Sequence, residues 1–336
     1  MKKCMLIFLC VAAGWVHAQQ RPHYTQYILN NYIINPALAG IENYTDIKLS
    51  HRHQWVGIQD APVTTYITVS APIDKKDDRT TATSFEREGE NPRGRSFVES
   101  YTSAKPHSGV GMTLINDQTG PLKRFSLYGS YAYHIGLTPQ VSISAGFSAG
   151  FTNNSLNTAK LIFANPIDPA VSGSGYLNKI RPDLTAGIYI YSPLFFVGAA
   201  MQQILPQKLS FAGDTLVVRN KSYPQTFVTA GYKFFLSDDI SMIPSAVVRY
   251  ANPAPLGVDL NAKIQYRDQL WIGGTYRYKD GIAAMVGINV NSTFNIGYAY
   301  DYTTSQLNRF TRGTHEVVLG FILGNKYGDW CPRNIL

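Results

Sequence analysis

The chain has 336 residues and a formal net charge of +8, with 22 Tyr, 16 Phe and 28 Gly but only 15% charged residues. The basic excess is spread along the chain without a Lys/Arg-rich run, so we expect no nucleic-acid partner. Beyond the first 18 residues, no segment has the ~20 consecutive apolar residues of a membrane-spanning helix, which excludes a helical membrane protein.

Residues 1–18 have the features of a secretory signal peptide. Lys2 and Lys3 precede a long apolar run, and small residues occupy positions −3 and −1 of a cleavage site. We expect a mature chain that begins at Gln19 and carries a charge of +6, because Lys2 and Lys3 are lost. Only Cys331 would remain of the three cysteines, which excludes a disulfide framework within one chain.

The mature chain opens on an unusual aromatic stretch, YTQYILNNYIINPALAG, at residues 24–40. It lacks the strict alternation of a strand, and Asn35-Pro36 interrupts any helical pattern. We assign residues 19–45 to a separate N-terminal segment that precedes the first strand.

From Asp46 onward the sequence alternates apolar with polar or small residues in segments of about ten, a pattern typical of membrane β-barrels. In VSISAGFSAGF, at 141–151, the apolar side chains share one face and serine and glycine share the other. The segments 258–267 and 294–303 follow the same pattern, with tyrosines on their apolar faces. Such placement suits the aromatic belts at the two membrane interfaces.

The alternating segments predict an all-β fold, a transmembrane antiparallel β-barrel that spans residues 46–324. We count fourteen strands, an even number, as a closed single-chain barrel prefers. They are predicted at 46–58, 62–73, 107–117, 124–137, 140–153, 180–192, 194–204, 223–236, 239–251, 257–267, 269–279, 281–291, 293–304 and 314–324.

The connections predict the orientation in the outer membrane. Links after the even-numbered strands are mostly tight, whereas those at 154–179, 205–222 and 305–313 are long or broken by Pro and Gly. Because short turns belong on the periplasmic side, we expect both termini there, with residues 325–336 as a periplasmic tail. The segment 74–106 breaks the rule, and its charged composition predicts a mobile periplasmic insertion.

Several stretches together resemble the PorP/SprF family of type IX secretion system outer-membrane proteins. The resemblance begins in the aromatic stretch and runs through HRHQWVGI, PVTTYITVSAPI and GVGMTLINDQTG to the ending Cys331-Pro332-Arg333. Its most specific residues are Gln26, Tyr27, Asn30, Asn35, Pro36, Ala37 and Gly40.

The resemblance implies an outer-membrane protein of Bacteroidota that works with the type IX translocon and its periplasmic ring components, in a setting that includes gliding motility. It further implies a partner, a large secreted adhesin that is exported or held at the surface through its C-terminal domain. It implies neither an enzyme nor a cofactor. The insertion 74–106 and the tail beyond the last strand depart from the family pattern.

The resemblance suggests a role for the aromatic stretch at residues 24–40. Its Tyr and Asn side chains can stack and hydrogen-bond without facing lipid, so we expect it to line the lumen or to seal its periplasmic mouth as a plug or docking element. The alternative is a flexible leader to the first strand, although disordered leaders are seldom so aromatic.

Charged residues on the inward strand faces form a second candidate site. The alternation places five cations there, with Asp259 and Asp301 opposing them: Lys233, Arg249, Lys263, Arg267 and Arg277. One interpretation is a hydrated lining whose charges pair with neighbours. The other is a positive wall that binds a plug or a translocated polypeptide.

Other chemistry receives little support from the sequence. His51 and His53 point the same way on a strand, but no third metal ligand is apparent. A hydrolase triad of Ser126, His134 and Asp117 has nothing to fix its geometry. Three classes of function remain: an export or anchoring component, a passive porin, and, least favoured, a barrel enzyme.

Overall fold

The computed structural model describes residues 25–75, 91, 94–160, 176–205, 207–208, 221–252, 254–267, 269–291 and 293–324. The predicted signal peptide and C-terminal tail lie outside these residues. None of the helices in the described ranges is long and apolar enough to cross a membrane.

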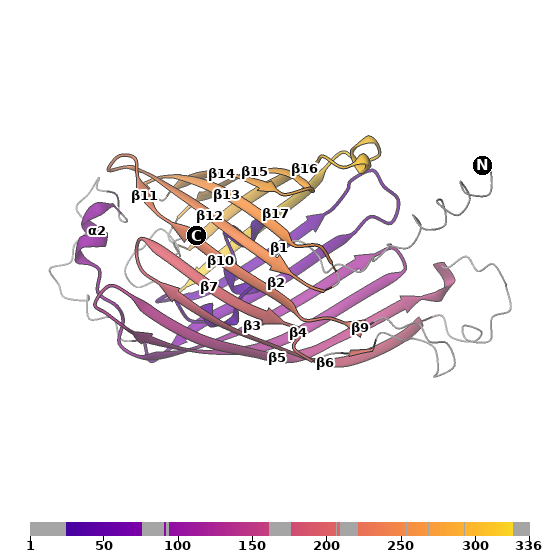
Figure 1. Cartoon of the computed structure of the whole chain (residues 1–336), viewed down its shortest axis with the longest axis horizontal. Helices are drawn as coiled ribbons and strands as arrows, with labels where there is room; N and C mark the ends of the chain where they lie inside the picture. Colours follow the sequence, from indigo (N-terminus) through magenta and orange to yellow (C-terminus); the bar gives the residue numbers. More distant parts are fainter. Residues whose placement is uncertain are drawn as a thin grey trace, which may run out of the picture.

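The wall is built from β-strands that follow one another around the ring (Figure 1). They are β1 (Thr45–His53), β2 (Val63–Ile73), β3 (His107–Thr119), β4 (Leu122–Gly136), β5 (Ser142–Asn157), β6 (Tyr176–Tyr191), β7 (Phe195–Gln202), β10 (Gln225–Tyr232), β11 (Phe234–Phe235), β12 (Ile240–Tyr250), β13 (Gly257–Tyr266), β14 (Leu270–Arg277), β15 (Gly281–Asn289), β16 (Phe294–Thr303) and β17 (Thr314–Leu323). A small separate ladder joins β8 (Gln207–Lys208) to β9 (Lys221–Ser222).

The ring is closed and antiparallel. β1 pairs with both β2 and β17, and β10 pairs with both β7 and β12. Since β11 continues β10 after a break at Lys233, the described residues form a barrel of fourteen wall strands, as the alternation predicted. A closed ring leaves no unpaired edge strand in the wall, which a membrane barrel requires.

The alternating residues take opposite faces of this wall, as expected. On β5, Ser144 and Ser148 are buried toward the lumen, whereas Phe147 on the same strand is 54% exposed. On β13, Asn261 and Lys263 are buried while Leu260 is 52% exposed. The apolar residues thus cover the outside of the barrel, where lipid would replace water, and the polar ones line its interior.

The two ends of the barrel differ. One end, here called the loop end, carries the connections β1–β2, β3–β4, β5–β6, β7–β10, β12–β13, β14–β15 and β16–β17. The other, the turn end, carries the remaining connections, including the region 74–106 between β2 and β3. The part of that region in the described ranges contains α2 (Arg95–Ser100), and Arg95 contacts Asp238 at the β11–β12 turn with a separation of 3.9 Å.

Residues 25–44, here called the lumenal segment, fill the interior of the barrel. The segment forms three single 3-10 turns, η1 (Gln26–Ile28), η2 (Asn31–Ile33) and η3 (Pro36–Leu38). Both clusters of buried apolar side chains in the described ranges combine residues of this segment with inward residues of the wall. The core of the protein is therefore the lumen of its barrel.

The lumenal segment runs from the loop end to the turn end. Thr25 contacts Arg52 and Glu316, near the loop end of β1 and β17, whereas Thr45 pairs with Leu323 at the turn end. The described chain thus begins toward one end of the barrel and finishes at the other. Both ends of the predicted mature chain lie outside the described residues, so the expectation that both are periplasmic stays a prediction.

Candidate functional site

The corner of the lumenal segment is formed locally by Asn35 and Pro36. Pro36 occupies the first position of η3, where its missing N–H costs no helical hydrogen bond. The Asn35 side chain caps this turn by accepting a hydrogen bond of 3.0 Å from the backbone N–H of Ala37. The same motif that stops a regular helix in the sequence therefore shapes a compact bend.

Side chains of the wall form hydrogen bonds with several polar groups of the lumenal segment. All residues from 25 to 40 are buried except Leu29, which is partly buried. Tyr27 donates to Asn261 of β13 at 3.0 Å, Asn30 donates to Thr68 of β2 at 2.8 Å, and Tyr32 donates to Ser130 of β4 at 2.8 Å. Burial raises the pKa of the Tyr27 and Tyr32 hydroxyls, so both phenols remain neutral donors at physiological pH.

The Asn35 corner is also joined to three neighbouring wall strands. Its amide nitrogen donates to the carbonyls of Ile188 on β6 at 3.0 Å and Ala199 on β7 at 3.3 Å. Ser144 of β5 donates to the carbonyl of Ala37 at 2.7 Å. Backbone groups of the wall thus recognise this bend directly.

Inward glycines of the wall allow the lumenal segment to approach so closely. A Cβ on Gly146 of β5 would lie 2.7 Å from the Cα of Ala37, and one on Gly187 of β6 would lie 2.1 Å from the Asn35 oxygen. Gly40 has φ +72°, and a Cβ there would lie 2.5 Å from the Cα of Gly109 on β3. Any larger residue at these positions would collide with the segment or with the wall.

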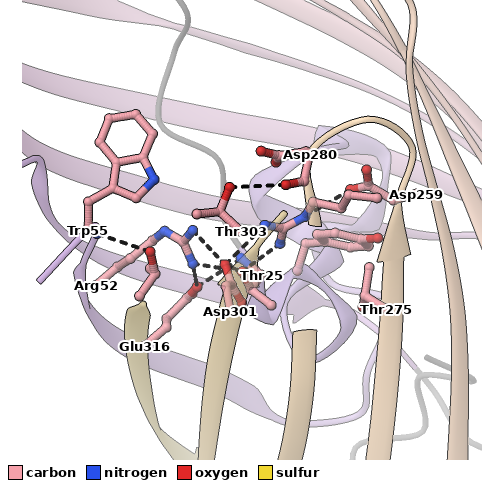
Figure 2. Close-up of polar contacts among 12 residues, drawn as sticks. Thr25, Arg52, Trp55, Asp259, Thr275, Asp280, Asp301, Thr303 and Glu316 are labelled. Carbon is pink, nitrogen blue, oxygen red and sulfur yellow. Dashed lines mark hydrogen bonds and ion pairs between the residues drawn. The ribbon is translucent and has the colours of Figure 1, made fainter. Parts of the chain in front are cut away.

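The start of the segment is held by a buried cluster of charges, which Figure 2 shows around Thr25. Arg52 of β1 lies 2.7 Å from Asp301 and 3.0 Å from Glu316. Arg277 of β14 lies 3.0 Å from the same Asp301 oxygen that Arg52 contacts. These four side chains come from β1, β14, β16 and β17 and converge on one residue of the lumenal segment.

Thr25 connects the whole cluster. Its hydroxyl accepts hydrogen bonds from Arg52 and Arg277, each at 2.6 Å, and donates one of 2.6 Å to Asp301. Its backbone N–H donates to Glu316 at 2.8 Å. A residue with this many charge-assisted bonds is fixed in position, since such bonds are stronger than those between neutral groups.

Four of the predicted inward cations contact carboxylates or aromatic rings of the wall. Arg249 pairs with Asp259 at 2.9 Å, and Arg277 pairs with Asp301. Lys263 lies 5.3 Å from the centre of the Trp271 ring and Lys233 lies 5.3 Å from that of Phe235. Carboxylates thus pair with Arg249 and Arg277, and both interpretations of the inward cations, a hydrated lining and a polypeptide-binding wall, stay predictions.

Arg267 does not belong to this inward group. It follows the last residue of β13, has φ +47°, and pairs with Asp239 at 2.9 Å in the turn-end connections. Its side chain is 38% exposed. The alternation pattern assigned Arg267 to the inward face because the predicted strand 257–267 continued one residue beyond Tyr266, where β13 ends.

Sequence reasoning missed Thr25, Arg52 and Glu316, although it noted Asp301. The signal was present for two of them, because alternation along β1 and β17 puts Arg52 and Glu316 on the inward faces. Nothing local marked Thr25, whose role depends on groups from four distant strands.

The other candidate chemistry does not assemble. The His51 ring bonds to Thr65, and no cluster of three or more metal-ligating side chains occurs in the part of the chain that the structure describes. Ser126 bonds to Thr152, Asp117 accepts from Thr64, and His134 bonds to the carbonyl of Ala39. The three triad candidates thus have separate partners.

Comparisons with known proteins give a family and a set of similar folds. Residues 16–321 match the family described as type IX secretion system membrane protein PorP/SprF. The solved structure of the CymD monoaromatic hydrocarbon channel is 11% identical, with 87% of this chain and 91% of that chain covered and a TM-score of 0.46. The Ralstonia pickettii toluene transporter TbuX is 13% identical, with 87% and 92% covered and a TM-score of 0.46. No curated protein sequence matches.

Proposed function

Because the chain belongs to the PorP/SprF family of type IX secretion system membrane proteins, we propose that it is a plugged outer-membrane component of that system. In this proposal the lumenal segment closes the barrel. The protein then serves the export and surface anchoring of a large adhesin through the adhesin's C-terminal domain, together with the translocon and its periplasmic ring components.

The observation that carries the proposal is the set of hydrogen bonds between the lumenal segment and the wall. The bonds reach β1, β2, β4, β5, β6, β7, β13, β14, β16 and β17, so they surround the segment. A segment that crosses the lumen with hydrogen bonds to wall strands on several sides leaves little room for a diffusing solute. This arrangement favours a binding or anchoring role over passive diffusion.

A passive porin is the competing function, and conductance distinguishes the two. The wild-type protein in a planar bilayer should show no steady ohmic current, whereas a variant that lacks residues 26–40 should conduct. Migration that changes on boiling would verify that the variant still forms a closed barrel. A wild-type current as large as that of the deletion variant would contradict the closed lumen.

The adhesin role needs a cellular test. Deleting the gene should remove the large adhesin from the cell surface, as measured by protease shaving of intact cells and mass spectrometry of the released peptides. Complementation with the wild-type chain should restore the adhesin. Unchanged adhesin display in the deletion strain would contradict the anchoring role and leave only membership of the secretion system.

A further inference from the structure

Basic side chains lie together on the outside of the barrel, where β1 and β17 meet the loop end. His53 and His315 stand directly opposite each other in the register of these two strands, so their Cβ atoms are about 4.5–5.5 Å apart. Each follows or precedes a buried residue, Arg52 or Glu316, and therefore points away from the lumen. We call this group the outer basic patch, and its members are His51, His53, Arg312 and His315.

The loops beside the patch hold Arg312 next to the histidine pair. The backbone N–H of Arg312 donates to the carbonyl of Val56 at 2.7 Å, and the N–H of Val56 donates to the carbonyl of Gly313 at 2.8 Å. The Tyr300 hydroxyl donates to the Arg312 carbonyl at 3.2 Å, and the Tyr300 ring centre lies 5.2 Å from that of His315. The strand ends and the loop therefore present their cations on one surface.

Within the described residues, no carboxylate of the four surrounding strands faces the patch. The carboxylates of β1, β2, β16 and β17 are Asp46, Asp301 and Glu316, and all are buried inside the barrel. In the described loops that join these strands at the loop end, the single carboxylate is Asp60, which pairs with Lys160 at 3.1 Å. The patch is therefore a local excess of positive charge on the outer face, which favours an anionic ligand.

The donors of the patch suit a phosphate group. The Arg312 side chain and the His53 ring have no hydrogen-bond partner in the part of the chain that the structure describes. Nδ1 of His315 lies 2.7 Å from the Tyr298 hydroxyl, and when that hydroxyl donates, the ring proton lies on Nε2 and can be donated outward. A guanidinium binds two oxygens of one anion at once. A phosphate monoester has three oxygens to share among these side chains, whereas a carboxylate has two.

The surface below the patch is apolar, which selects a lipid among phosphate compounds. Along the outer face of β17, His315 is followed by Val317 and Phe321, each 39% exposed. Tyr298 and Tyr302 on the neighbouring β16 are also exposed, as expected of an aromatic belt at headgroup level. The patch thus lies where headgroups meet acyl chains, so a phosphate with attached acyl chains would contact both surfaces.

We propose that the outer basic patch binds the phosphate group of a membrane lipid whose acyl chains lie along Val317 and Phe321. This inference goes beyond the proposed function, because it requires neither a closed lumen nor a secreted partner. The headgroup bridges β1 and β17, the first and last strands of the wall. The bound lipid therefore stabilises the seam at which the ring closes.

The test uses the full mature chain in non-ionic detergent micelles, after removal of metal ions with EDTA and dialysis. The probe is dihexanoyl phosphatidic acid, and native mass spectrometry counts the molecules bound at each concentration. The comparison probes are dihexanoyl glycerol, which lacks the phosphate, glycerol phosphate, which lacks the acyl chains, and the acidic peptide N-acetyl-triglutamate. We expect saturable binding of phosphatidic acid and at least tenfold weaker binding of each comparison probe. Absence of saturable binding, or equal binding of any comparison probe, would overturn the proposal.

Two exposed cations of the loop end provide matched variants. Arg312→Gln removes a charge from the patch, whereas Lys279→Gln removes one from the β14–β15 connection, where Lys279 lies 5.1 Å from the Tyr278 ring centre. Phosphatidic acid should bind at least tenfold more weakly to Arg312→Gln and equally well to Lys279→Gln. The double variant His53→Gln, His315→Gln repeats the test if Arg312→Gln does not fold. Equal binding by the patch variants and Lys279→Gln would overturn the assignment to this patch.

Discussion

The two halves of the lumenal segment are held in the barrel by different interactions. At Thr25 the wall provides four charged side chains that converge on one hydroxyl and one N–H. From Asn35 to Gly40 it provides backbone carbonyls and glycines that let main chain pack on main chain. The first half thus depends on charge pairing and the second on shape. Substitutions can separate these contributions.

The largest effect is expected at the charged half. Arg52→Met removes the arginine that pairs with both Asp301 and Glu316, whereas Arg277 pairs with Asp301 but not with Glu316, so the change would leave buried charge uncompensated. The free energy of unfolding from lipid vesicles in urea should fall by about 3–5 kcal/mol. The matched control is Lys160→Met, which breaks the half-exposed pair with Asp60 and should cost no more than about 1 kcal/mol. Equal small losses would mean that the buried cluster contributes no more than a surface pair.

The next effect concerns shape. Gly146→Val forces a side chain into the backbone of Ala37 and should cost about 1–3 kcal/mol. Because the collision displaces the lumenal segment rather than the wall, we expect a measurable conductance in a barrel that still inserts. Gly129→Val on β4 is the control, since a Cβ there meets nothing within 4 Å. If neither valine variant conducts, the close packing of Gly146 against Ala37 does not determine the position of the lumenal segment.

Within the second half, Asn35→Ala tests the polar corner. The change removes the cap of η3 and the bonds to Ile188 and Ala199, and losing a cap of this kind costs about 0.5–2 kcal/mol. Proteolysis of the lumenal segment in the folded protein, followed by mass spectrometry, should become faster. Asn308→Ala removes an exposed hydrogen bond to Tyr302 and should leave the rate unchanged. If protease cleaves the lumenal segment at the same rate in both variants, the conformation of the corner does not depend on Asn35.

The smallest loss of stability is expected at Tyr27, which lies between Thr25 and Asn35 in the lumenal segment. Tyr27→Phe removes one bond, but Asn261 still accepts from Thr275 at 2.8 Å, so we expect a loss of about 0.5–1.5 kcal/mol. Burial raises the pKa of Tyr27, so its neutral form stabilises the fold below the unfolded value of about 10. Stability should therefore decline above that pH in wild type, and less so in Tyr27→Phe. Identical alkaline profiles from urea titrations would show that Tyr27 does not contribute.

Much of the wall was predictable because alternation is a local property. A strand such as 258–267 shows its lipid face and its lumen face in the order of its own residues, so the strand positions and the fourteen-strand count followed. The same rule correctly indicated that Asp259 and Asp301 oppose the cations. It failed at Arg267, because the end of a strand depends on the turn that follows and not on the period of the strand.

The sequence alone determined the barrel, the faces of its strands and the break at Asn35-Pro36, because each depends on residues close together along the chain. Only the tertiary structure decided that the lumenal segment runs from the loop end to the turn end, and which carboxylate each arginine contacts. Thr25 meets Asp301 and Glu316 across 276 and 291 residues of sequence. Such contacts arise only when ring closure brings the first and last strands together, and no local pattern encodes which groups will then meet.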